Sequence, residues 1–230
     1  MQKFIGNLKM KSKTIAIIPA RGGSKRLPEK NILLLNGIPL LVYSILYAKA
    51  NQEIIDEIYV TTDNQEIKNI ALHYGVNVID RPLSISGDFE PTISALQHVL
   101  QSIDYNVDTV VLLQPTNPLR PANLLKECFK KYQDLQVNSL FTITQNHQKL
   151  GKIQNQKFIT INYQIGQRSQ DLEPLYFENG LLYITKAKTI LEDKIISEQA
   201  FPYLINHIFA KVDIDTQEDF DYAEYLTKKT

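Results

Sequence analysis

Short, wholly apolar runs alternate with amphipathic stretches along residues 15–133 of the chain. An uninterrupted apolar run, such as residues 15–18, is typical of a strand buried on both faces of a parallel sheet. The pattern predicts strands at residues 15–18, 56–63, 76–79 and 108–114, and helices at 37–50, 64–75, 92–102 and 121–133. Because strand and helix alternate four times, we expect right-handed βαβ units and an α/β fold with a doubly wound, mostly parallel sheet.

The pattern changes after Asn138. Residues 139–145 predict one more strand, and the polar segment that follows alternates at 158–163, which predicts exposed hairpins. Strand and helix patterns then return, as strands at 179–185 and 206–213 and a helix capped by Thr216 that ends near Lys228. We therefore expect one domain over 14–230, preceded by a leader at 1–13 and interrupted by an insertion at 138–178. A surface hairpin without a function would explain the polar excursion equally well.

The loop after the first predicted strand concentrates positive charge. Four cations lie within ten residues beside two glycines and a serine: Arg21, Lys25, Arg26 and Lys30, with Gly22, Gly23 and Ser24. Glycines let backbone N–H groups approach a ligand, and such a set suits a polyphosphate. The spacing matches neither G-x-x-x-x-G-K-[ST] nor G-x-G-x-x-G, so composition alone fits a solvated basic turn equally well.

Polar residues also mark the ends of other predicted strands, where ligands bind in open α/β sheets. Asp63 and Gln114 end two of them, and the pair Asp213 and Asp215 ends the last one. Alternation along a strand puts both carboxylates on one face, where a hard cation that bridges to phosphate oxygens would relieve their repulsion. The alternative is a solvated strand end before the last helix. A D-x-D-x-T phosphatase is disfavoured, because Gln217 replaces its threonine and that motif belongs on a first strand.

Charge and cysteine content narrow the class of protein. The 230 residues carry 25 basic and 25 acidic side chains, so no overall field recruits nucleic acid or an anionic membrane, and we expect neither as a partner. The single cysteine, Cys128, permits no disulfide within the chain and fits a buried thiol in a cytoplasmic protein. Residues 1–13 lack the apolar core of a signal peptide, and Met10 is an alternative start. The four histidines show no metal-binding spacing.

Residues 18–31, Ile-Pro-Ala-Arg-Gly-Gly-Ser-Lys-Arg-Leu-Pro-Glu-Lys-Asn, closely resemble the opening signature of the acylneuraminate cytidylyltransferases, the CMP-sialic acid synthetases. Asn31 follows Lys30 as in the sialic acid branch, whereas the related KDO cytidylyltransferases usually have proline there. The resemblance implies a nucleotide-diphospho-sugar-transferase-like, Rossmann-like fold whose loop wraps CTP. It assigns nucleotide binding to Arg21, Gly22, Gly23, Ser24, Lys25, Lys30, Asn31, Arg81 and Thr92, and catalysis to Arg21, Lys30 and Asp215. One departure is Asp88-Phe-Glu-Pro-Thr92, where the family usually has an Asp-Thr-Ala-Ser-type run.

A second block, Leu112-Leu-Gln-Pro-Thr-Asn-Pro-Leu-Arg120, also resembles the family. Its two prolines stiffen the turn, so we expect Gln114 and Arg120 to be presented with little conformational freedom to lose. The resemblance assigns Gln114 to the sugar. A rigid turn before a helix explains the prolines, but it does not explain a glutamine at the tip of a strand.

The resemblance also implies that the insertion is a dimerisation arm that reaches the sugar site of a partner subunit. Arg168 and Gln170 are similar to an arm element that faces the sugar carboxylate, which a guanidinium binds bidentately. An exposed arginine on a polar loop is the alternative reading. Phe177-Glu178 stands where sialic acid enzymes often have Arg-Pro before the Asn-Gly turn, so we expect Phe177 at the sugar. The resemblance also implies a lysine on this arm near residues 148–152, and both Lys149 and Lys152 fit that position.

The resemblance therefore implies a homodimeric, cytoplasmic CMP-nonulosonate synthetase. It would transfer CMP from CTP to the anomeric hydroxyl of an N-acylneuraminate-type sugar and release pyrophosphate, with Mg²⁺ held by Asp213 and Asp215. Legionaminic acid or another diamino nonulosonic acid is the alternative substrate, and KDO is a weaker one. From another functional class, a catalytically silent nucleotide-sugar-binding module remains an alternative.

Overall fold

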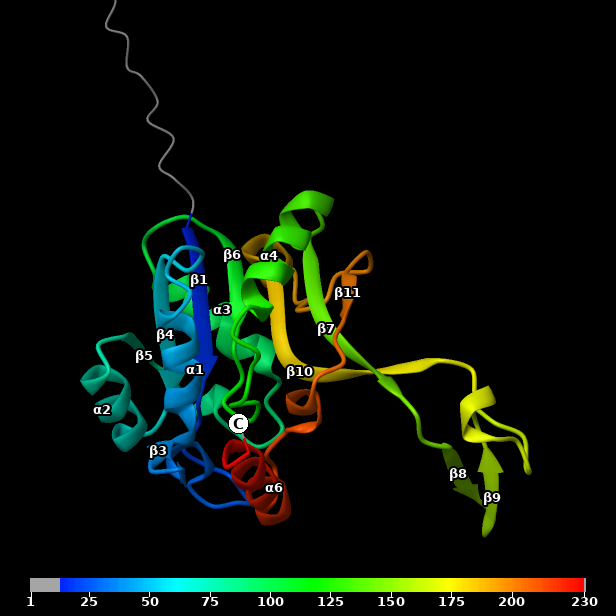
Figure 1. Cartoon of the computed structure of the whole chain (residues 1–230). Coiled ribbons are helices and arrows are strands. Elements are labelled where there is room, and N and C mark those ends of the chain that lie inside the picture. The colour runs from blue at the N-terminus through cyan, green and yellow to red at the C-terminus, as the bar shows by residue number, and fades with distance from the viewer. Residues whose placement is uncertain (1–12, 230) are drawn as a thin grey trace, which may run out of the picture.

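A central sheet of seven strands organises the computed structural model, which describes residues 13–229 (Figure 1). In sheet order the strands are β11 (Phe201–Leu204), β7 (Ser139–Asn146), β10 (Leu175–Lys186), β6 (Val107–Leu112), β1 (Lys13–Pro19), β4 (Glu57–Thr62) and β5 (Asn77–Asp80). β10 pairs antiparallel with β6 and β7, and the other neighbouring strands pair in parallel. The expected α/β fold with a mostly parallel sheet is confirmed.

Helices cover both faces of this sheet. α1 (Leu40–Lys49), α2 (Gln65–His73) and α4 (Leu124–Leu135) pack on one face, and α3 (Thr92–Ser102) and α5 (Ala187–Leu191) on the other. β1 shows why its sequence is apolar throughout: Ala16 and Ile18 face one cluster, Ile15 and Ile17 face the other, and all four are fully buried. Cys128 is a buried free thiol in α4, as expected. No helix within residues 13–229 is long and apolar enough to cross a membrane.

A third apolar cluster closes the edge of the sheet at the carboxyl ends of the parallel strands. It joins α6 (Gln217–Thr227) to the short hairpin of β2 (Leu34–Leu35) and β3 (Ile38–Pro39), and it buries Val212 and Ile214. The 3-10 turns of the body are η1 (Lys30–Ile32), η2 (Leu83–Ile85) and η4 (Ile208–Lys211), and η3 (Ser169–Asp171) lies in the predicted insertion. This edge also carries the loop after β1, so α6 and the loop lie together (Figure 1).

Some predicted elements differ from the structure. The helices expected from Gly37 and Pro121 are present but begin at Leu40 and Leu124. The strand expected at 206–213 is replaced by the 3-10 turn η4 and an extended segment, and the true strand is β11, a few residues earlier. His207 Nδ1 accepts a hydrogen bond from the backbone N–H of Phe209 and so starts the turn. Val212 and Ile214 are apolar because they pack against α6, outside the sheet.

Lys13, which the sequence placed in the leader, is the first residue of β1. Residues 1–12 of that leader, with Met10, lie outside the described residues.

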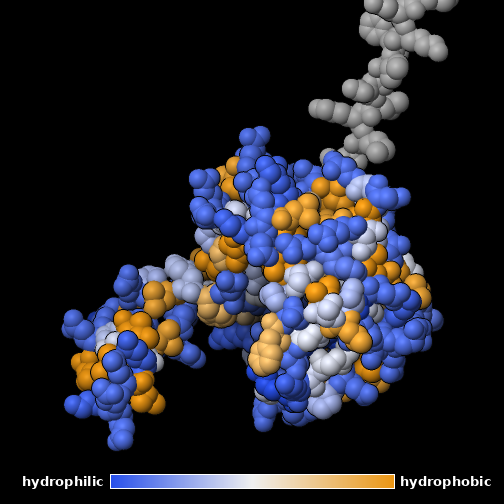
Figure 2. Space-filling model, turned by 180° about the vertical axis from the view of Figure 1, so that it is seen from behind, coloured by the Kyte–Doolittle hydropathy of each residue, from blue (hydrophilic) through white to orange (hydrophobic). Residues whose placement is uncertain are grey.

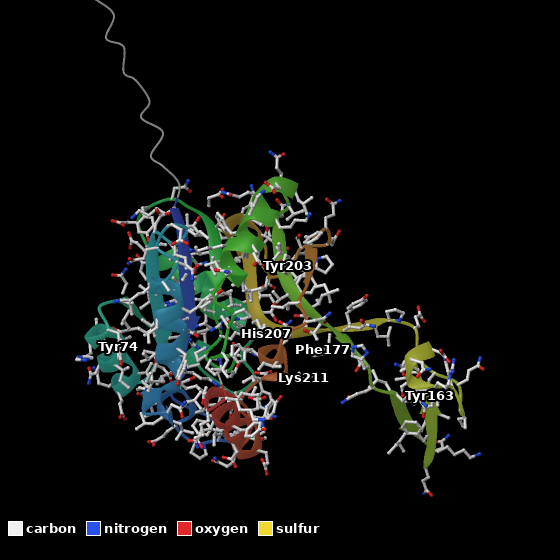
Figure 3. The ribbon with its side chains drawn as sticks, viewed as in Figure 1. Tyr74, Tyr163, Phe177, Tyr203, His207 and Lys211 are labelled. Atoms are coloured by element: carbon white, nitrogen blue, oxygen red, sulfur yellow. The ribbon has the colours of Figure 1, made fainter. Side chains whose placement is uncertain are left out.

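An arm projects from the body between the outer ends of β7 and β10 (Figure 1). The hairpin of β8 (Gly151–Gln154) and β9 (Lys157–Thr160) lies at its far end. Apolar surface gathers over this arm (Figure 2), and the exposed large side chains there include Ile153, Phe158, Ile159, Ile161 and Ile165. Figure 3 shows Tyr163 near the far end of the arm and Phe177 near its root. Such a surface on a thin projection has no partner within the described chain.

Candidate active site

A pocket of about 240 Å³ opens at the carboxyl ends of β1, β5 and β6. It brings together eight residues that the sequence singled out: Arg21, Gly23, Ser24, Lys30, Asn31, Arg81, Thr92 and Gln114. An adjoining hollow of about 370 Å³ shares Arg21, Ser24, Lys30 and Asp88 with this pocket and adds three further residues that matter here: Lys25, Arg26 and Asp215. The loop after β1, the first turn of α3 and the end of β6 therefore converge on one cavity.

The two glycines of the loop have different surroundings. A Cβ on Gly22 would lie 2.7 Å from the Cβ of Asn64, so the loop packs against the N-terminus of α2 only because this residue has no side chain. The backbone N–H of Gly22 donates to Asp63 Oδ1 at 2.8 Å. A Cβ on Gly23 would meet nothing within 4 Å, and this residue lines the pocket. Gly22 thus fixes the loop, while Gly23 leaves room beside the pocket.

Carboxylates pair with all four cations of the loop. Arg21 Nη1 lies 2.9 Å and Lys25 Nζ 2.7 Å from the carboxylate of Asp88. The hydrogen bond from Lys25, with the charges of both cations, holds the pKa of Asp88 below its usual range despite some desolvation. On the other side of the loop, Asp215 binds Arg26 and Lys30 at 2.6 and 2.8 Å. A polyphosphate that enters the cavity would therefore exchange places with carboxylates that already neutralise the cations.

Asn31 and Arg81 are buried at the inner wall of the pocket. The Asn31 side chain donates to the backbone oxygen of Arg21 at 2.8 Å and so anchors the start of the loop. Arg81 donates to the backbone oxygen of Thr61 at 2.6 Å. Burial lowers the pKa of Arg81 to about 10, and the nearby charge of Asp63 opposes that shift. Both side chains are held rigidly before any ligand arrives.

The segment that carries Asp213 and Asp215 is attached to the turn after β6. The backbone N–H of Ile214 donates to Thr116 O at 2.8 Å, and Asn117 Nδ2 donates to Val212 O at 2.8 Å. Val212 and Ile214 point into the core. Asp213 and Asp215 alternate with them along the segment, so the two carboxylates share the outer side. The expected common face is present, although the segment is not a strand of the sheet.

The electrostatics of the pair fit a divalent cation. Burial raises the pKa of Asp213; the hydrogen bond from Thr116 opposes this rise, and the negative charge of Asp215 adds to it. Within residues 13–229 no group of three or more His, Cys, Asp or Glu side chains is placed to hold a metal. Two carboxylates that complete their coordination with phosphate oxygens are the usual arrangement for Mg²⁺. The residues present therefore fit an ion that arrives with a nucleotide.

A family model for cytidylyltransferases, built from many sequences, matches residues 15–230. The chain belongs to the cytidylyltransferase family. It is therefore an enzyme, a nucleotidyltransferase, and the pocket at the end of β1 is the candidate active site of this cytidylyltransferase.

Curated relatives resemble the cytidylyltransferase over most of its length. It is 35% identical to the pseudaminic acid cytidylyltransferase of Campylobacter jejuni subsp. jejuni serotype O:23/36, covering 94% of this chain and 97% of the relative. It is 36% identical to the CMP-N,N'-diacetyllegionaminic acid synthase of Legionella pneumophila, covering 92% and 95%. It is 33% identical to the N-acylneuraminate cytidylyltransferase of Streptococcus agalactiae serotype V, covering 90% of this chain but 52% of that longer relative.

Solved structures share the fold. The CMP:2-keto-3-deoxy-manno-octonic acid synthetase complexed with CTP superposes with a TM-score of 0.71 at 16% identity, covering 95% of this chain and 99% of that one. The 4-diphosphocytidyl-2C-methyl-D-erythritol synthase from Anaerococcus prevotii gives 0.63 at 16% identity, covering 94% and 99%. At this identity the likeness shows a shared fold.

Asn117 and Gly180 are structural supports of the site, and the sequence marked them only as members of two blocks that resemble the family. Asn117 is fully buried and donates to the backbone oxygens of Asn179 and Val212. Gly180 adopts φ +73°, and a Cβ there would lie 2.6 Å from Asn117 Oδ1. The Asn-Gly turn is thus needed for close packing behind the site. Its only signal in the sequence was the match to the family's turn.

Arg120 is not presented to a ligand as the sequence predicted. It is buried, and burial lowers its pKa to about 10. Its guanidinium donates to the backbone oxygens of Leu181 and Gln114 at 2.6 and 2.8 Å and to Ser44 Oγ at 3.1 Å. Arg120 therefore fixes the backbone of Gln114 by a hydrogen bond, while the Gln114 side chain lines the pocket.

The predicted arm residues do not line the pocket of their own chain. Arg168 makes a bidentate ion pair with Asp171 at 2.8 and 3.1 Å, and Gln170 is exposed in η3. Phe177 is exposed near the root of the arm (Figure 3). Lys149 donates to the backbone oxygen of Gln167, whereas Lys152 is exposed on β8; neither reaches the pocket. The single chain thus brings together most of the residues that the sequence predicted to bind the nucleotide and leaves these arm side chains apart from them.

Proposed function

We propose that this cytidylyltransferase transfers CMP from CTP to the anomeric hydroxyl of a nonulosonic acid and releases pyrophosphate. The observation that carries the proposal is the convergence of Arg21, Lys30 and Asp215 on one cavity beside Gln114. The sugar hydroxyl attacks the α-phosphorus and loses its proton to solvent. The new oxygen–phosphorus bond forms as the bond between the α-phosphorus and the oxygen that bridges to the β-phosphorus breaks, and pyrophosphate leaves with that electron pair. Preorganised cations stabilise the charge that develops on the transferred group.

The residues of the loop have separate roles in this proposal. Arg21, Ser24, Lys25 and Lys30, with the backbone of Gly22 and Gly23, hold the triphosphate. Asn31, Arg81 and Thr92 line the inner end of the pocket, where they bind the nucleoside. Rigid anchoring of Asn31 and Arg81 supports this role, because little side-chain freedom is lost when the nucleoside enters.

We assign a Mg²⁺ ion to Asp213 and Asp215. When bound, the ion would lower the pKa of the attacking hydroxyl and neutralise charge on the phosphates. The hydroxyl of Thr116 hydrogen-bonds Asp213, and the backbone N–H of Asp215 donates to Asp219, so both ligands are oriented by this chain. Lys30, the present partner of Asp215, is then free to contact the triphosphate.

We propose further that two copies of the chain associate through the arm in the cytoplasm. The exposed apolar side chains of the arm support this assembly, because a thin projection of this kind gains burial only against another surface. In the homodimer Arg168, Gln170 and Phe177 of one copy would face the sugar pocket of the other. This placement explains why a single chain keeps them away from Gln114.

The sugar is an N-acylneuraminate-type nonulosonic acid, with legionaminic acid or another diamino nonulosonic acid as the alternative and KDO as the weakest. The names of the curated relatives span these sugars. A panel of nonulosonic acids offered with CTP and Mg²⁺, scored by pyrophosphate release, tests the proposal. Release with at least one of these sugars is the expected result. Binding of CTP without release for any sugar would overturn it in favour of a silent nucleotide-sugar-binding module.

A further inference from the structure

The two carboxylates assigned to the metal lie on a segment that the central sheet does not hold. β11 ends at Leu204, and residues 212–215 follow η4 outside the seven strands. Such a segment needs other anchors if its carboxylates are to meet a cation with a fixed geometry. The turn after β6 supplies these anchors, at Thr116 and Asn117.

Both peptide units that flank Asp213 are tied to this turn. The backbone oxygen of Val212 accepts a hydrogen bond from Asn117 Nδ2 at 2.8 Å. The backbone N–H of Ile214 donates to the backbone oxygen of Thr116 at 2.8 Å. The first bond fixes the peptide before Asp213 and the second fixes the peptide after it. The position from which the carboxylate extends is therefore set on both sides.

Asn117 is itself fixed by a chain of buried hydrogen bonds. Its side-chain Nδ2 also donates to the backbone oxygen of Asn179 at 3.1 Å. The Asn179 side chain accepts from Thr142 Oγ1 at 2.6 Å and donates to Thr144 Oγ1 at 3.0 Å. Both threonines belong to β7, so the chain of hydrogen bonds runs from a strand of the sheet to the segment of Asp213.

The hydroxyl of Thr116 has two acceptors within reach. It hydrogen-bonds the carboxylate of Asp213, and it lies 3.3 Å from Asn117 Oδ1. A hydroxyl has one proton to donate, so Asn117 is the alternative acceptor when a cation draws the carboxylate away. The proton then stays paired, and the carboxylate can turn to the cation without the cost of an unpaired donor.

We propose that Asn117 is a positioning residue for the metal. It fixes the backbone of Asp213 and, through the hydroxyl of Thr116, the direction of the carboxylate. The inference rests on the proposed function and adds to it a fully buried residue that lines neither hollow of the site. A packing role alone would make Asn117 matter only for stability. A positioning role makes it matter for how strongly Mg²⁺ promotes the binding of CTP.

The test measures the affinity of the full chain for CTP without sugar, first in EDTA and then in saturating Mg²⁺. The ratio of the two dissociation constants gives the contribution of the cation to nucleotide binding. Asn117→Ala should reduce this ratio by about tenfold or more, the usual effect of losing a residue that orients a metal ligand. It should leave the affinity for CTP in EDTA unchanged. The Mg²⁺ concentration that gives half-maximal pyrophosphate release should rise in parallel.

Thr116→Val tests the same role by a second route, at a position that is only partly buried. It removes the hydroxyl with little change of volume and should also reduce the ratio. Thr116→Ser keeps the hydroxyl and should restore most of the wild-type ratio. A role in packing alone would not separate valine from serine in this way.

Asn51→Ala is the matched control, because Asn51 is also buried and donates to a backbone oxygen, that of Tyr47 at 2.8 Å, outside the site. It should lower Tm and leave the ratio unchanged. An unchanged ratio in both Asn117→Ala and Thr116→Val, or an equal fall in Asn51→Ala, would overturn the inference and leave the proposed function standing. Absence of pyrophosphate release with every sugar would instead overturn the proposed function and this inference together.

Discussion

Lys30 Nζ lies 2.8 Å from Asp215 Oδ1, although the two residues are 185 positions apart in the sequence. The Lys30 side chain is 12% exposed and the Asp215 side chain 37%, so this ion pair is shielded from solvent mainly on the Lys30 side. This ion pair joins the loop after β1 to the segment to which we assign the metal. The two parts of the proposed mechanism are therefore in contact before any ligand is bound.

We predict that Arg21→Ala and Asp215→Ala each lower the rate of CMP-sugar formation by about a hundredfold or more. Loss of one preorganised charge stabiliser typically costs roughly 3 kcal/mol in the transition state. Steady-state pyrophosphate release at saturating Mg²⁺ measures the effect. Lys126→Ala is the control, because this exposed lysine pairs with Glu53 away from the cavity. Near-normal rates in both folded variants would contradict the mechanism.

Asp213 should make stability depend on pH in the absence of a divalent ion. Its pKa is raised in the folded protein, so the unfolded chain releases this proton at lower pH. Its contribution to the free energy of unfolding is therefore most favourable at acidic pH and declines as pH rises through the folded-state pKa. We expect Asp213→Asn to melt above the wild type at neutral pH in EDTA, with the difference shrinking in acid.

The same substitution should abolish the stabilisation that the wild type gains from Mg²⁺ with CTP. Thermal melts with and without the two ligands measure it. An Asp213→Asn variant that melts below the wild type at neutral pH, or that retains the full ligand-induced shift, would contradict this assignment.

Gly180→Ala should destabilise the protein and weaken activity. The φ of +73° disfavours a side chain, and the new Cβ would also press on Asn117, which holds the backbone of Val212. Strain of this kind costs about 1–3 kcal/mol, which lowers Tm by roughly 2–4 °C per kcal/mol in a domain of this size. Gly37→Ala is the control, because its φ is +76° but nothing lies within 4 Å of a Cβ there. Equal losses of activity in the two variants would argue against a role for the contact with Asn117.

Ile165→Asp should convert the proposed homodimer into monomers. Ile165 is 89% exposed on the arm, and a charge there would be costly to bury against a second copy. Light scattering coupled to gel filtration gives the mass. Leu72→Asp on α2 is the control, since Leu72 is an exposed apolar residue of the body. We expect the monomer to bind CTP normally and to use the sugar poorly; a wild type that is itself monomeric would refute the assembly.

Local signals in the sequence predicted the parts of the fold that depend on local interactions. Asn64 caps α2 and Thr216 caps α6 with a capping box, as side-chain chemistry at these positions dictates. The strands buried on both faces were equally predictable, because their sequences are uninterrupted apolar runs. The segment at 206–213 was misread, because its apolar residues are buried by α6 and not by a neighbouring strand, and such long-range packing leaves no periodic trace.

The candidate site was predictable where one short stretch carries it. The loop from Arg21 to Asn31 was found from its cations and its family signature. The pairing of those cations with Asp88 and the burial of Arg120 depend on contacts between distant segments, so no local pattern could indicate them. The location of the arm residues depends on a surface outside the chain, which a single sequence cannot describe.

The ion pairs of Asp88 with Arg21 and Lys25 have a consequence for turnover. A loop of unneutralised cations would hold pyrophosphate as tightly as it holds CTP, and product escape would then limit the rate. Asp88 can re-form its ion pairs with Arg21 and Lys25 as the product leaves. These ion pairs lower the free energy of the ligand-free enzyme relative to the product complex. We expect Asp88 to weaken nucleotide binding, because it competes for the same cations, and for the same reason to shorten the residence time of pyrophosphate.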